Sequence, residues 1–155
     1  MRYVAIDLGD KRTGLAVGDA QTGLVSPLEV VETPVTERGG EALLAELARV
    51  LADQVGPADL VMGLPLNMDG SEGPGAAKSR DFGARLAERT GRKVHFQDER
   101  LTSAEADWSM ARSGLTHKGK KQRRDALAAA VILRDFLGAN RDRSRPSDIH
   151  GAPQG

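Results

Sequence analysis

The chain has 155 residues, of which 39% are hydrophobic, and it has no cysteine and a formal net charge of zero. This length fits one domain with a sizeable core, and the lack of cysteine excludes disulfides, thiolate metal sites and cysteine nucleophiles. No apolar run is long enough for a membrane span and no signal-peptide pattern is visible, so we expect a cytoplasmic protein with no membrane partner.

The neutral total hides a charge asymmetry along the chain. Residues 1–110 carry 12 Lys and Arg against 18 Asp and Glu, a net charge of −6, whereas residues 111–145 carry 10 against 3, a net charge of +7. The second segment is therefore a candidate contact for a polyanion such as nucleic acid. The alternative is an ordinary solvated helix followed by a disordered basic tail.

Alternating apolar stretches near the N-terminus predict three antiparallel strands, over residues 2–8, 13–18 and 24–31. In the first of them Val4 and Ile6 share one face, whereas Ala5 and Asp7 share the other. Burying an unpaired carboxylate costs several kcal/mol, so such a residue usually meets a cation, a metal or several hydrogen-bond donors. Asp7 is therefore the first candidate functional residue.

Helices and strands alternate in the rest of the chain, which demands parallel pairing of the later strands. Predicted helices cover about residues 43–55, 76–89, 102–112 and 122–137, and predicted strands cover 59–64 and 93–97. The basic stretch 113–121 is predicted as a loop. The order predicts an α/β fold with a five-stranded mixed sheet flanked by helices, in one domain over residues 1–138 with a disordered tail over 139–155.

Three acidic residues stand where a structural carboxylate is least comfortable. They are Asp7 in the first strand, Glu99 at the end of the fifth strand and Asp125 on the apolar face of the last helix. If the first and fifth strands lie near the middle of the sheet, the three carboxylates can converge. Hard divalent cations relieve the repulsion in such a cluster, so one or two Mg²⁺ or Mn²⁺ ions are implied, which suits phosphodiester hydrolysis.

Each of these acids also has a structural explanation. Asp7 could accept hydrogen bonds from the following turn, Glu99 could pair with Arg12 or Arg100, and Asp125 lies in a first helical turn, where negative charge is favoured. These alternatives stay open.

Two further assignments are open near the same positions. Asp98 competes with Glu99, because one residue of register decides which side chain points inward. Lys11 and Arg12 follow the first strand and could contact a phosphate, or could pair with Asp19 or Glu99.

Four segments together resemble the YqgF/RuvX family of Holliday junction resolvases and nucleases that mature the precursor of small-subunit ribosomal RNA. They are AIDLGDKRTGLAVGD at 5–19, VMGLPLNMDGSEGP at 61–74, VHFQDERLTSAEA at 94–106 and KGKKQRRDALAAAVIL at 118–133. The first segment alone also resembles the phosphate-binding turn of actin-like kinases. The four segments in this order are specific.

The resemblance implies a ribonuclease H-like fold in which Asp7, Glu99 and Asp125 are catalytic and bind Mg²⁺ or Mn²⁺. It implies a nuclease acting on structured RNA or branched DNA, in pre-16S rRNA processing or Holliday junction resolution. RuvC-type resolvases have a histidine where Gln122 stands, so we expect no general base there. A homodimer would suit a symmetric junction. The alternative is a module on the same fold that binds nucleic acid or a ribosome-assembly partner without turnover.

Basic residues supply the candidate nucleic-acid contacts. They are Arg12, Lys118, Lys120, Lys121 and Arg124. Each would add a salt-dependent increment of affinity through a backbone phosphate. The resemblance places Lys120 and Lys121 on a loop that faces the nucleic-acid backbone.

Overall fold

A computed structural model describes residues 1–99 and 117–143 and, within the last helix, the side chains of residues 126–139. The strands are β1 (Arg2–Leu8), β2 (Thr13–Asp19), β3 (Val25–Val31), β4 (Asp59–Leu64) and β5 (Val94–Asp98). The helices are α1 (Glu41–Val50), α2 (Pro74–Thr90) and α4 (His117–Arg143), with short helical turns η1 (Glu37–Gly40) and η2 (Leu51–Val55) beside α1. The helix predicted over residues 102–112 lies outside the described residues.

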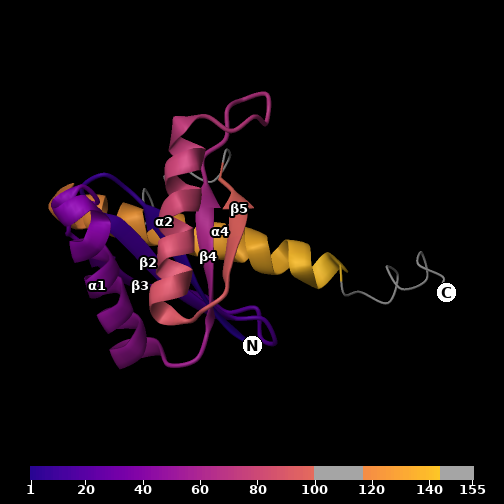
Figure 1. The fold of residues 1–155 in the computed structure, drawn as a ribbon. Helices are drawn as coiled ribbons and strands as arrows, with labels where there is room; N and C mark the ends of the chain where they lie inside the picture. The colour runs from indigo at the N-terminus through magenta and orange to yellow at the C-terminus, as the bar shows by residue number, and fades with distance from the viewer. Residues whose placement is uncertain (100–116, 144–155) are drawn as a thin grey trace.

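The five strands form one mixed sheet in the order β3-β2-β1-β4-β5 (Figure 1). β1 and β3 both pair antiparallel with β2, whereas β4 runs parallel to β1 and to β5. The predicted mixed sheet is therefore confirmed. β5 is an edge strand and not a central one, so β4 separates it from β1. Because β1, β4 and β5 are parallel, their carboxyl ends nevertheless lie along the same end of the sheet, which is called the sheet edge below.

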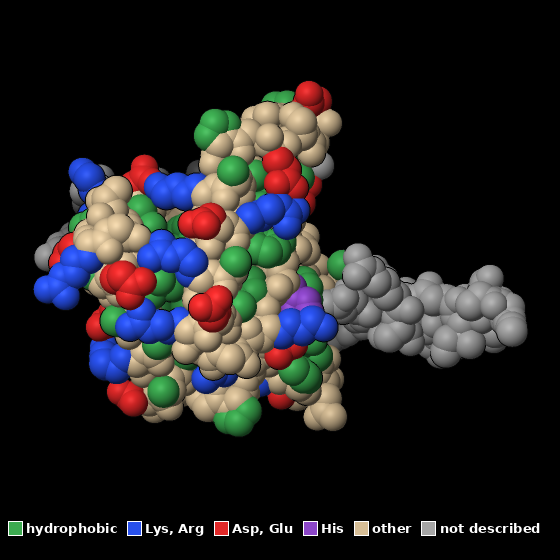
Figure 2. Space-filling model, in the orientation of Figure 1, with side chains coloured by type: hydrophobic (Ala, Val, Ile, Leu, Met, Phe, Trp, Pro, Cys, Tyr) green, Lys and Arg blue, Asp and Glu red, His purple; other side chains and the backbone are tan. Residues whose placement is uncertain are grey.

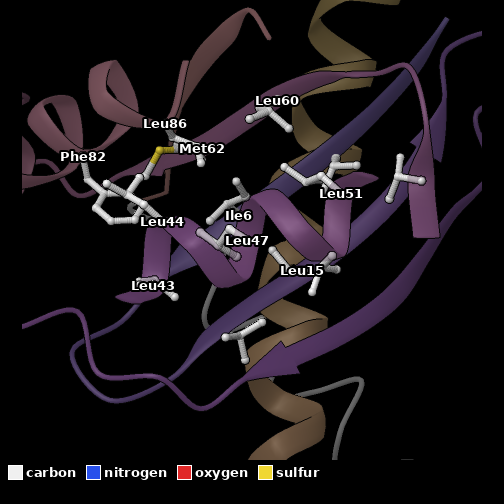
Figure 3. Close-up of a cluster of buried hydrophobic side chains, with 14 of the residues drawn as sticks. Ile6, Leu15, Leu43, Leu44, Leu47, Leu51, Leu60, Met62, Phe82 and Leu86 are labelled. Carbon is white, nitrogen blue, oxygen red and sulfur yellow. The ribbon is translucent and has the colours of Figure 1, made fainter. Parts of the chain in front are cut away.

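Successive side chains of β1 point alternately into two apolar cores, one on each face of the sheet. Val4 and Ile6 are fully buried on the face covered by α1 and α2, where they meet the leucines of α1 (Figure 3). Ala5 is buried on the opposite face, against Ala129 and Ile132 of α4. Small side chains on both sides of that contact let α4 approach the sheet closely. Asp7 continues the series on the α4 face.

α4 is longer than the sequence predicted. It begins at His117 and ends at Arg143, so residues 117–121 belong to a helix and not to the predicted loop, and residues 139–143 are also helical. Lys, Arg, Gln and Ala favour helices, and together they outweigh Gly119 and Gly138, each of which costs about 1 kcal/mol relative to Ala. Within residues 1–99 and 117–143, no helix is both long and apolar enough to cross a membrane.

Thr13 offers a test of the packing beneath the β1–β2 turn. Its side chain is fully buried, and its hydroxyl oxygen has no hydrogen-bond partner among the described residues. Because an unsatisfied buried hydroxyl is destabilising, we expect Thr13→Val to raise the free energy of unfolding by about 1 kcal/mol. Thermal denaturation should show a rise in Tm of about 3 °C.

Thr90→Val is the matched control for this substitution. The Thr90 hydroxyl donates to the Leu86 carbonyl oxygen at 2.7 Å and accepts from the Arg92 backbone N–H at 3.2 Å. The same loss of a hydroxyl should therefore lower the Tm at position 90. An equal loss of stability at both positions would contradict the structure around Thr13.

Candidate active site

The carboxyl ends of β1, β4 and β5 bring Asp7, Gly63 and Glu99 together. Asp7 comes one residue after the last registered pair between β1 and β4, so it lies beside Gly63. Glu99 follows β5 directly, and its backbone N–H donates to the Leu64 carbonyl oxygen at 3.3 Å, which extends the β4–β5 ladder. Three strands thus position one small cluster at this edge of the sheet.

Glu99, rather than Asp98, faces Asp7. A hydrogen bond joins the Glu99 and Asp7 side chains. Phe96 packs near Gly83 on the α2 side of the sheet, and strand alternation puts Asp98 on that side with it. Neighbouring residues of a strand point to opposite faces, so Glu99 lies on the side of α4, as Asp7 does. The register that the sequence left open therefore brings Glu99 to Asp7.

The Glu99 carboxyl is forced toward its protonated form. Burial is the largest cause, followed by repulsion from the Asp7 carboxylate and by the hydrogen bond to Asp7, with a smaller contribution from Asp98. Together they raise the pKa of Glu99 from its ordinary value of 4.5 to about 7. At neutral pH either a shared proton or a bound cation would relieve the electrostatic repulsion between the two carboxylates.

This pair fits a hard divalent cation, because it supplies closely spaced carboxylate oxygens in a partly desolvated position. Among the residues that the structure describes, no group of three or more His, Cys, Asp or Glu side chains could hold a metal ion. The third predicted ligand, Asp125, is a helical position of α4, and its side chain lies outside the described ones. The described part of the site is thus a pair of acids.

Two neighbouring segments hold the turn after β1 at Asp10. Lys78 of α2 places its Nζ 2.9 Å from Oδ1 of Asp10, and the Val35 backbone N–H donates to the Asp10 carbonyl oxygen at 3.0 Å. Arg12 lies 3.9 Å from Glu32, a partner that the sequence did not suggest. The Arg12 side chain is 29% exposed and that of Glu32 is 57% exposed, so this long ion pair contributes at most about 1 kcal/mol.

The segment after β4 is a compact turn that projects beyond the sheet edge (Figure 1). The Asn67 backbone N–H donates to the Ser71 carbonyl oxygen at 2.9 Å, and the Ser71 backbone N–H donates to Asp69 Oδ1 at 2.9 Å. Asn67 and Asp69 therefore shape a turn, as their residue types indicate. Glu72 ties the segment to α2 through a two-bond ion pair with Arg80.

The face formed by α1 and α2 is not a polyanion surface. Figure 2 shows Lys and Arg interleaved with Asp and Glu over these helices. Many of the charges are paired, as in Arg49–Glu46, Arg80–Glu72, Arg85–Glu41 and Arg89–Glu41. The basic surface predicted from the sequence therefore does not lie on this face.

The strongest candidates for that surface are on α4. Lys118, Lys120, Lys121 and Arg124 belong to its first turns, although their side chains lie outside the described ones. Their contacts with phosphate stay predictions. The structure differs from the prediction in the backbone at the three lysines, which is helical and not a loop.

Two residues at this end of the sheet, Gly63 and Lys78, were not predicted from the sequence. A glycine inside an apolar strand signals a bulge or a close approach by another group, so Gly63 carried a usable signal. Lys78 carried none, because its partner Asp10 is 68 residues away in the chain.

The chain is similar to proteins of one known family. A model of the family described as RuvX, Holliday junction resolvase, matches residues 1–139. A relative from Anaeromyxobacter sp. (strain Fw109-5) is 45% identical over 138 residues, covering 88% of this chain and 96% of the relative. One from Lactococcus lactis subsp. cremoris (strain MG1363) is 37% identical over 139 residues, covering 90% and 95%. Both carry the provisional name pre-16S rRNA nuclease.

Solved structures show the same fold. RuvC from T. thermophilus, in complex with a Holliday junction substrate, matches with a TM-score of 0.58 and 20% identity, over 92% of this chain and 96% of that one. Fowlpox virus resolvase, in complex with Holliday junction DNA, matches with a TM-score of 0.58 and 12% identity, over 90% and 99%. The fold is therefore the ribonuclease H-like fold of these resolvases, and the match over residues 1–139 shows that the chain belongs to the RuvX family.

Proposed function

We propose that this protein is a metal-dependent nuclease that hydrolyses phosphodiester bonds in structured nucleic acid, with the precursor of 16S rRNA as its principal substrate. The observation that carries the proposal is the Asp7–Glu99 carboxyl pair at the sheet edge. A structural carboxylate needs no second acid beside it, whereas a cation site does. The names of the relatives in the RuvX family support the choice of substrate.

Asp7 and Glu99 would hold Mg²⁺ or Mn²⁺, with Asp125 as a third ligand from α4. One or two such ions would activate a water molecule and stabilise charge on the phosphate oxygens. Asp125 shares a helical face with Ala129 and Ile132 by spacings of four and seven residues. Because Ile132 packs beside Gly63 and Glu99, α4 runs over the acidic pair.

The residues of the chain have separate roles in this proposal. Glu99, whose pKa is raised beside Asp7, would have to lose its proton to serve as a ligand, and a bound cation would favour that loss by offsetting the repulsion between the two carboxylates. Arg12 would leave its weak pair with Glu32 to contact a phosphate of the substrate. Lys118, Lys120, Lys121 and Arg124 would hold the backbone through charge and shape, with little readout of sequence.

Branched DNA is the second candidate substrate. The description of the matching family, Holliday junction resolvase, favours it. Because a four-way junction is symmetric, this activity would call for a homodimer with two acidic sites, whereas cleavage of ribosomal RNA would not. If the protein binds nucleic acid but shows no metal-dependent turnover, it is a binding module and not a nuclease.

The first prediction from the proposed function concerns cleavage itself. Asp7→Asn should lower Mn²⁺- or Mg²⁺-dependent cleavage of pre-16S rRNA by about a hundredfold or more, because it removes one charge from the pair. Substrate binding should remain, as measured by gel shift without divalent metal. Asp53→Asn, at an exposed acid in η2, is the matched control and should cleave normally. Equal cleavage by both variants would exclude a catalytic role for Asp7.

The second prediction concerns stability without metal. Since the pKa of Glu99 is raised in the folded state, its contribution to stability is complete below about pH 4.5 and is lost as the pH rises through about 7. The wild type should therefore lose stability relative to the Glu99→Gln variant as the pH rises from 5 to 8. The difference between their free energies of unfolding should change by an amount on the order of 1–2 kcal/mol, which allows for solvent screening.

Urea unfolding in the presence of a chelator measures this difference, and addition of Mn²⁺ at pH 8 should restore the wild type but not the variant. A difference between the two proteins that does not change with pH would mean that Glu99 is not held against Asp7.

The third prediction concerns the basic turns of α4. Replacing both Lys120 and Lys121 with Gln should weaken binding of RNA at low salt and reduce the slope of log K against log salt by roughly 0.7–0.9 for each phosphate that the variant no longer neutralises. Lys93→Gln, at the residue just before β5, is the control and should leave the slope unchanged. A slope that stays the same in the double variant would remove this surface from the proposal.

A further inference from the structure

Gly63 lies in an apolar strand, β4, where the backbone conformation does not require a glycine. Its φ is outside the left-handed region, and the register between β4 and β5 passes through it without a bulge. Glycine weakens a strand interior, because it adds chain entropy to the unfolded state and leaves nothing to pack. Its neighbours Met62 and Leu64 are buried apolar residues. Another constraint must therefore favour glycine here.

The space above Gly63 is filled by the acidic pair and by α4. A Cβ built on Gly63 would lie 3.0 Å from Cδ of Glu99, and nearer still to its Oε2. It would also lie 2.7 Å from Cδ1 of Ile132. Real Cβ atoms essentially never approach other heavy atoms within 3.0 Å. Any side chain at position 63 would therefore displace both the Glu99 carboxyl group and the Ile132 side chain.

The sheet topology explains why Glu99 needs this space. β4 lies between β1 and β5, so Asp7 and the end of β5 are two strand spacings apart, roughly 9.5 Å. Glu99 can meet Asp7 only by lying across β4. Gly63 is the β4 residue beside Asp7, on the same face of the sheet. A side chain standing on that position would separate the two carboxyl groups.

We propose that Gly63 is a positioning residue, whose missing side chain opens the gap over β4 through which Glu99 reaches Asp7. The effect on metal binding rests on the proposed function, whereas the steric effect does not. The rival explanation is that Gly63 only makes room for Ile132 of α4. The two explanations differ in which partner substitution relieves the strain of an added methyl group.

A double-mutant cycle on the metal-free protein separates them. Gly63→Ala should lower the Tm by about 3–6 °C, because the methyl group overpacks a filled space. In a Glu99→Ala background the same substitution should cost less than half as much, since the carboxyl group is gone. In an Ile132→Val background, which removes Cδ1, most of the cost should remain.

The cycle also decides the case in which Gly63→Ala alone does not fold. Recovery of a folded protein by Glu99→Ala would support the proposal, and failure of the double variant to fold would overturn it. An equal loss of Tm in the wild-type and Glu99→Ala backgrounds would overturn it, as would relief by Ile132→Val alone.

Gly83→Ala is the matched control, because a Cβ there would lie 2.8 Å from Cζ of Phe96, on the other face of the sheet. Mn²⁺ titration followed by electron paramagnetic resonance should show at least tenfold weaker binding for Gly63→Ala and unchanged binding for Gly83→Ala. Equal loss of Mn²⁺ affinity in both variants would contradict a specific role for Gly63. No Mn²⁺ binding by the wild type would overturn the proposed function, and the stability cycle would still decide the steric role.

Discussion

Two carboxyl groups in contact are costly unless something neutralises them, and the Asp7–Glu99 pair places this cost at one edge of the sheet. Burial and mutual repulsion raise the pKa of Glu99 to about 7, so its protonated form is favoured up to neutral pH. A protein selected only for stability would replace one of the two acids. The functional proposal follows from the presence of both at this position.

The rest of the fold keeps the pair in place. The central strand β1 is buried on both faces, which fixes the position of Asp7 between two apolar cores. β4 brings β5 close enough for Glu99 to reach across, and Gly63 leaves the path clear. α4 closes the same face through Ile132. Lys78 of α2 and Val35, which follows β3, both contact Asp10 and so hold the turn that contains Arg12. The site thus depends on packing from both layers.

Much of this fold could be predicted from the sequence, because period-two alternation and turn residues mark the strands directly. The face of Asp7 followed from its alternation with Ile6. The central place of β1, the edge position of β5 and the contact between Glu99 and Asp7 depend on long-range pairing, which local patterns do not encode. The predicted start of α4 was wrong because Gly119 indicates a loop locally, whereas its helix-forming neighbours decide the backbone. The Lys78–Asp10 pair had no local signal at all.

The proposed function depends on a divalent cation shared by Asp7 and Glu99. A crystal structure of the wild type grown with Mn²⁺ above pH 7, with an anomalous difference map collected near the manganese absorption edge, would locate such an ion. We expect a manganese peak in direct contact with carboxylate oxygens of both residues. A map in which the two carboxyl groups remain bonded to each other, with manganese absent or bound elsewhere, would contradict it.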